Sequence, residues 1–188
     1  MDIVSYQAWK RKGFPGLLAG DTILTTKPGH WLTWALVFFQ SVVKRRAVIW
    51  RHVMRYKGQG RVLSQEKVHR EASLEEWIGQ TLRVYSNPGY SPADRRHLVE
   101  QSEAKLGRLY DGLGIVGQIA RCLPLVGDWL AGVIQVSALN YCSEGHCEDE
   151  RTRRPAFRQG KSCKCSPDDI DAECNRLGDR CWTFKLVP

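Results

Sequence analysis

The chain has 188 residues, 43% of them apolar, which is enough to bury the core of one ordinary domain. Its formal net charge of +8 favours anionic partners such as a membrane surface or a cell-wall polymer, or simply gives an ordinary basic surface. The sequence contains no arginine-rich arm and no nucleic-acid-binding motif, so we do not expect specific nucleic-acid binding.

Targeting signals are not evident. The first twenty residues are basic at 10–12 but contain no apolar run of signal-peptide length. The most apolar stretch, residues 31–43, is shorter than the roughly 20 residues that cross a membrane. We therefore expect neither a signal peptide nor a transmembrane segment, which leaves a cytoplasmic location or a non-classical or phage-associated export route open.

In the first half of the chain, β-branched runs alternate with one segment of helical spacing. The core is expected to begin near residue 17. The predicted elements are a strand at 22–26, a helix at 31–43, a strand at 47–56, a hairpin turn at 57–60 and a strand at 61–68.

In the second half, apolar periodicity and serine N-caps, among them Ser73 and Ser91, predict several helices. The predicted elements are a short helix at 74–78, a strand at 81–85, a helix from 91 to about 109, a buried helix at 126–136, helix starts at 142 and 166, and a strand at 182–186. Residues 148–164 are charged and predict a loop. We expect a single domain over residues 1–188, with a charged, cysteine-containing insertion at about 146–165.

Cys142 stands out because Tyr141-Cys142-Ser143-Glu144 places a cysteine at a predicted helix start. Only the thiolate of cysteine is nucleophilic, and the positive end of a helix favours that form. The backbone amide there would also donate to a developing oxyanion. The commoner role of a cysteine is that of a small buried apolar residue, and this composition alone does not decide between the two.

A wider set of short motifs occurs in a recognisable order. The motifs are Gly20-Asp21 before a strand, Arg51-His52-Val53, Tyr110-Asp111, Tyr141-Cys142-Ser143-Glu144 and Ser166-Pro167-Asp168-Asp169-Ile170. Their order resembles that of the permuted papain-like amidases and peptidases, which are related to the NlpC-type and YiiX-like proteins and, more distantly, to the lecithin:retinol acyltransferase group. The resemblance implies an α+β fold, with an antiparallel sheet or half-barrel packed against helices. Two features depart from the family: Arg51 replaces the usual serine, and a charged insertion follows Glu144.

The resemblance also implies a mechanism, in which Cys142 attacks a carbonyl, His52 acts as the base and a thioester forms. No cofactor or metal is implied. A polar residue on the neighbouring strand usually orients the histidine, and the candidates here are Ser64, Gln65 and Glu66, with Ser64 and Glu66 on one face. We select Glu66 because a carboxylate best supports an imidazolium, although a solvated surface glutamate is an equal interpretation.

The other histidines compete with His52. His30 and His97 are expected to be exposed, and His69 lies beyond the predicted strand without a motif around it. His146 follows Cys142 by four residues, so on a helix it shares a face with the cysteine and is an alternative base or metal ligand.

Five further cysteines lie in the last quarter of the chain: Cys147, Cys163, Cys165, Cys174 and Cys181. Disulfides would staple the insertion but need an oxidising compartment. Free thiols are a second possibility. A zinc site is the third, although one residue between Cys163 and Cys165 is fewer than zinc motifs usually have.

These patterns leave three functions open. The first is cleavage of an amide bond, for example in a peptidoglycan stem peptide. The second is a lipid-directed acyltransferase or thioesterase, which the apolar segment 31–43 and the basic charge would serve at a membrane. The third is a binding or structural module that keeps the fold without its chemistry.

Overall fold

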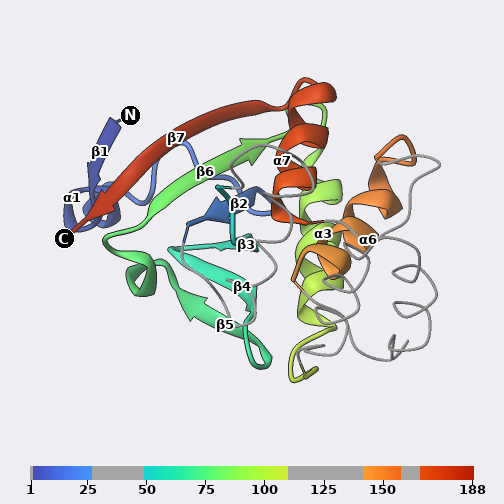
Figure 1. The fold of residues 1–188 in the computed structure, drawn as a ribbon, viewed down its shortest axis with the longest axis horizontal. Helices are drawn as coiled ribbons and strands as arrows, with labels where there is room; N and C mark the ends of the chain where they lie inside the picture. The colour runs from blue at the N-terminus through green and yellow to red at the C-terminus, as the bar shows by residue number, and fades with distance from the viewer. Residues whose placement is uncertain (1, 27–48, 110–141, 158–165) are drawn as a thin grey trace, which may run out of the picture.

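The structure, a computed structural model, describes residues 2–26, 49–109, 142–157 and 166–188. Within these ranges the chain forms an open seven-stranded sheet with helices packed against it (Figure 1). The strands are β1 (Asp2–Ser5), β2 (Thr22–Thr25), β3 (His52–Gly58), β4 (Arg61–Gln65), β5 (His69–Ser73), β6 (Thr81–Ser86) and β7 (Arg180–Val187). The helices are α1 (Tyr6–Arg11), the 3-10 helix η1 (Leu74–Trp77), α3 (Pro92–Glu103), α6 (Cys142–Arg153) and α7 (Pro167–Arg176). The expected combination of an antiparallel sheet with helices is confirmed.

The sheet order is β1-β7-β6-β2-β3-β4-β5, and the pairing is antiparallel everywhere except between β1 and β7. β2 is therefore flanked on both sides, by β6 and β3. In that pairing Thr25 lies opposite His52, at the end of β2 and the beginning of β3. The strand that follows the Gly-Asp motif and the strand that carries the candidate base are thus neighbours inside the sheet.

Several boundaries differ from the predicted ones. The strand expected at 61–68 ends at Gln65, and a further strand, β5, begins at His69. The helix expected to reach about 109 ends at Glu103. α6 continues to Arg153, although the composition of 148–164 predicted a loop there. The predicted helices at 31–43 and 126–136 lie outside the described residues.

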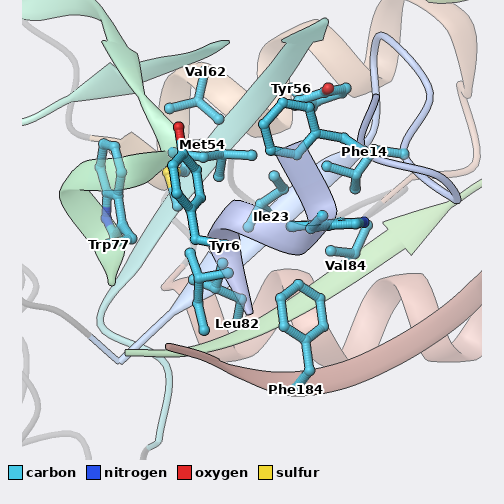
Figure 2. Packing of buried hydrophobic residues seen from close by; sticks show 14 of the residues in the cluster. Tyr6, Phe14, Ile23, Met54, Tyr56, Val62, Trp77, Leu82, Val84 and Phe184 are labelled. Carbon is cyan, nitrogen blue, oxygen red and sulfur yellow. The ribbon is translucent and has the colours of Figure 1, made fainter. Parts of the chain in front are cut away.

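The core does not begin near residue 17, because α1 contributes to it. Tyr6 is buried in an apolar cluster with residues of the sheet (Figure 2). Trp9 belongs to the same cluster. Trp9 meets the rings of Phe14 and Phe184 edge-on, with centroids 5.3 and 5.1 Å away. Gly60, at φ +72°, lies against Phe14, since a Cβ there would come within 2.5 Å of that ring. The hairpin between β3 and β4 therefore needs glycine at this position.

The opposite face of the sheet is covered by α6 and α7. Strand alternation sends Leu24 and Val53 to this face, where they pack with Cys147 of α6 and Ile170 of α7. α3 packs beside α6, as Figure 1 shows. The sheet thus separates two apolar clusters, one toward α1 and one toward α6 and α7.

A central β2 position should dominate stability. Ile23 is fully buried, whereas Ile3 on β1 is 72% exposed. We expect Ile23→Ala to lower the free energy of unfolding by about 2–5 kcal/mol, because it removes buried methyl groups and leaves a cavity. Ile3→Ala should change it by less than about 0.5 kcal/mol. Urea denaturation of both variants measures this, and similar losses in the two would contradict the assigned core.

Candidate functional site

His52 is the first residue of β3 and is fully buried, with 1% of its surface exposed. Its Nε2 lies 2.8 Å from the hydroxyl of Ser64, which is itself buried on β4. Ser64 pairs with Met54 in the sheet, so His52, Met54 and Ser64 share one face. The hydrogen bond between the two strands holds the imidazole in a defined orientation.

The three candidates for an orienting residue take different positions. Ser64 contacts His52. Gln65 donates from Nε2 to the backbone oxygen of Arg108, at 3.3 Å. Glu66 follows the end of β4 and accepts a hydrogen bond of 2.9 Å from Arg70. The structure thus brings Ser64 to the histidine, while Glu66, the residue preferred from the sequence, is paired with an arginine.

Cys142 is the first residue of α6, as the sequence predicted, and its side chain lies outside what the structure describes. Gly145, in the first turn of α6, lines a small cavity together with Val53 and Gln65. The beginning of α6 therefore lies near the end of the sheet at which β3 starts and β4 ends. α6 packs on the Val53 face, whereas His52 belongs to the other face. The helix that begins at Cys142 and the imidazole of His52 thus lie on opposite faces of the sheet, near the same end of it.

A buried charge cluster anchors the rest of α6. Arg55 of β3 and Glu150 of α6 are each 1% exposed, and Nη1 of Arg55 donates to Glu150 at 2.6 Å. Glu150 also accepts from Arg154 at 2.8 Å and from the hydroxyl of Tyr90 at 2.6 Å. Burial alone would raise the pKa of Glu150, but the charges of Arg55 and Arg154 lower it below its ordinary value. The carboxylate is therefore ionised.

His146 belongs to the same cluster. Its Nε2 lies 2.9 Å from the hydroxyl of Thr22 and 3.7 Å from a carboxylate oxygen of Glu150. Burial, reinforced by the positive charge of Arg55, lowers the pKa of His146 well below its ordinary value. A neutral, buried imidazole bonded to β2 acts here as a packing and hydrogen-bonding group.

His69 lies beyond the end of β4, as the sequence predicted, but it belongs to a further strand that the sequence did not predict. It begins β5, is 7% exposed, and its Nε2 lies 3.3 Å from the hydroxyl of Ser102 on α3. Burial, followed by the charge of Lys105, lowers the pKa of His69 to about 4. Of the two histidines expected at the surface, His97 is half-buried on α3 and His30 lies outside the described residues.

The C-terminal cysteines divide into different states. Cys174, buried on α7, and Cys181, exposed on β7, carry free thiols. Cys147 is fully buried on α6. Cys163 and Cys165 lie outside the described residues. The described histidine, cysteine and acidic side chains form no group of three that would hold a metal ion.

Comparisons with known proteins add no assignment. No protein-family model matches the chain, and no curated protein matches it at a significant level. Among the described helices, none has the length and apolar character needed to cross a bilayer.

The Arg55–Glu150 pair predicts a large effect of one substitution. Glu150→Ala leaves a buried guanidinium without its carboxylate, and we expect it to lower the free energy of unfolding by about 3–5 kcal/mol. Glu75→Ala, at an exposed position of η1, is the matched control and should cost less than about 0.5 kcal/mol. Thermal and urea denaturation measure both, and equal losses would contradict the anchoring role.

His69 predicts a pH dependence of stability. Its folded-state pKa of about 4 lies below the ordinary 6.5, so between these values the unfolded chain binds more protons than the folded protein. The free energy of unfolding should therefore fall as the pH drops from 6.5 toward 4. We expect His69→Gln to flatten this slope and His97→Gln to leave it unchanged. Urea denaturation at pH 7, 5.5 and 4.5 gives the slopes, and an unchanged slope in His69→Gln would refute the prediction.

Proposed function

We propose that this protein is a cysteine-nucleophile hydrolase that cleaves amide bonds, with Cys142 as nucleophile, His52 as base and Ser64 as the residue that positions His52. The observation that supports it most directly is the buried 2.8 Å hydrogen bond between His52 and Ser64 at the start of β3. A catalytic base needs a fixed orientation, and Ser64 of the neighbouring strand orients His52 by this hydrogen bond. The order of the motifs, which resembles that of the permuted papain-like amidases, supports the same proposal.

The proposed reaction has two halves. His52 accepts the thiol proton of Cys142, and the thiolate attacks the carbonyl carbon of the amide to form a tetrahedral oxyanion. Collapse of the oxyanion breaks the C–N bond, and the amine leaves with the proton from His52. Water, deprotonated by His52, then attacks the thioester and releases the acid and the free thiol.

The contact on β4 engages one of the two imidazole nitrogens, because Nε2 of His52 lies 2.8 Å from the hydroxyl of Ser64. Ser64 provides a neutral hydroxyl where a carboxylate would stabilise an imidazolium more strongly. The start of α6 therefore has the larger share in stabilising the Cys142 thiolate, since helix N-termini favour negative charge.

Thiol reactivity tests the nucleophile. In reduced protein we expect iodoacetamide to modify Cys142 faster than Cys181 at pH 7, with an apparent pKa well below about 8.5. Cys181 is the internal reference, because it is an exposed free thiol of the same chain. Mass spectrometry across pH 5–9 locates and times each modification. His52→Ala should remove the advantage of Cys142, and Ser64→Ala should reduce it.

The control and the substrate test complete this experiment. His97→Ala should leave the modification rates unchanged, because His97 lies on α3, whereas His52 and Ser64 lie on β3 and β4. On peptidoglycan stem peptides, we expect Cys142→Ala to abolish turnover and His52→Ala to lower it by about 10²–10⁴-fold. If the protein turns over acyl-lipid esters and not stem peptides, it is a lipid-directed acyltransferase or thioesterase. A Cys142 no more reactive than Cys181 would point to a module without catalytic chemistry.

A further inference from the structure

A second cavity opens at the end of β3 opposite His52. It has a volume of about 710 Å³, and its lining includes Lys57, near the far end of β3. The cavity lies between the residues before β2, the N-terminal half of α3 and the loop that follows β6. Its size falls in the range of about 300–1,000 Å³ that is typical of small-molecule sites. Neither His52 nor Ser64 lines it.

The walls of this cavity are fixed by Arg95. Its Nη1 donates to a carboxylate oxygen of Asp21 at 2.7 Å, and its Nη2 donates to the hydroxyl of Ser86 at 3.1 Å and to the backbone oxygen of Asn87 at 2.8 Å. Gly20 approaches the α3 backbone so closely that a Cβ would lie 3.1 Å from the Cα of Arg95. One guanidinium thus ties α3 to the residue before β2 and to the end of β6.

Part of the cavity wall is apolar. Leu18 is 52% exposed, and Val99, Pro88 and Pro92 line the cavity with it. Tyr90 adds an aromatic ring whose hydroxyl already donates to a buried carboxylate. An exposed leucine against proline and valine offers a ligand apolar surface that water otherwise covers.

The charged residues that line the cavity are all basic. Lys57, Arg95, Arg96 and Arg180 line it, and none of its described lining residues is acidic. Lys57 is paired with two glutamates and Arg95 with an aspartate. Arg96 and Arg180 are exposed and have no ion-pair partner within the described part of the chain. Two guanidinium groups are therefore available to an anion at this site.

We propose that this cavity binds an amphiphilic organic anion, with a carboxylate or phosphate head between Arg96 and Arg180 and an apolar body against Leu18 and Val99. A simple inorganic anion would leave the apolar wall uncovered, and a neutral apolar ligand would leave the two arginines uncompensated. Only a molecule with both parts matches both surfaces. The site is separate from Cys142 and His52 and does not depend on the proposed catalysis.

Calorimetric titration tests the proposal with decanoate as the probe, below its micelle concentration. We expect saturable binding of decanoate, weaker binding of decanol and no comparable binding of inorganic phosphate. Arg96→Glu combined with Arg180→Glu should weaken decanoate binding by about tenfold or more, because two attractions become repulsions. Val99→Trp should also weaken it by filling the apolar part. Decyl phosphate compared with decanoate shows which head group the arginines prefer.

The matched control reverses two other exposed charges, Lys67→Glu with Lys185→Glu, which lie outside the cavity lining and should leave the affinity within about twofold. Cys142→Ala should bind decanoate normally, so a failure of the catalytic proposal leaves this one standing. Equal affinity for decanol and decanoate, equal affinity for inorganic phosphate, or equal affinity of the charge-reversed and control variants would each overturn the proposal.

Discussion

The position of α6 depends on the buried ion pair between Arg55 and Glu150. Through Glu150 the pair reaches Arg154 and Tyr90, and through Arg154 it reaches Asp179 at 2.8 Å, next to β7. One carboxylate therefore connects β3, α6, the loop after β6 and the turn before β7. Burying such charges contributes little net stability, because desolvation offsets most of the attraction. What the cluster does provide is a single position for the helix, since any shift would leave a buried charge unpaired.

The Gly-Asp motif has a structural meaning in this fold. Gly20, with φ of +88°, donates its amide to the backbone oxygen of Tyr56 at 2.8 Å and allows α3 to approach. Asp21 accepts from the amide of Leu18 at 2.9 Å and from Arg95. The motif thus joins β2, β3 and α3, and it directly follows Leu18 and Ala19, which line the larger cavity. A motif by which a sequence resembles a family can owe its residues to assembly of the fold instead of to a reaction.

Local interactions were predictable from the sequence, and long-range pairing was not. The N-caps Ser73 and Ser91 are both confirmed, because a capping box involves residues only three positions apart. The four residues of β1 pair with β7 at the other end of the chain, so nothing in their local sequence indicates this pairing. Alternation placed Ser64 and Glu66 on one face, but only the end of β4 at Gln65 decides that the serine, and not the glutamate, meets His52.

Because the residue beside His52 is a serine and not a carboxylate, the proposed thiol chemistry depends more strongly on the position of α6. A carboxylate would raise the basicity of the imidazole directly, whereas a hydroxyl mainly fixes its orientation. Activation of Cys142 then depends more on the helix end at which it lies, and that effect fades within one turn. The helix end is in turn held by Glu150, two turns further along α6. In this protein the reactivity of the thiol would therefore be set in part by a buried ion pair that contacts neither the thiol nor its base.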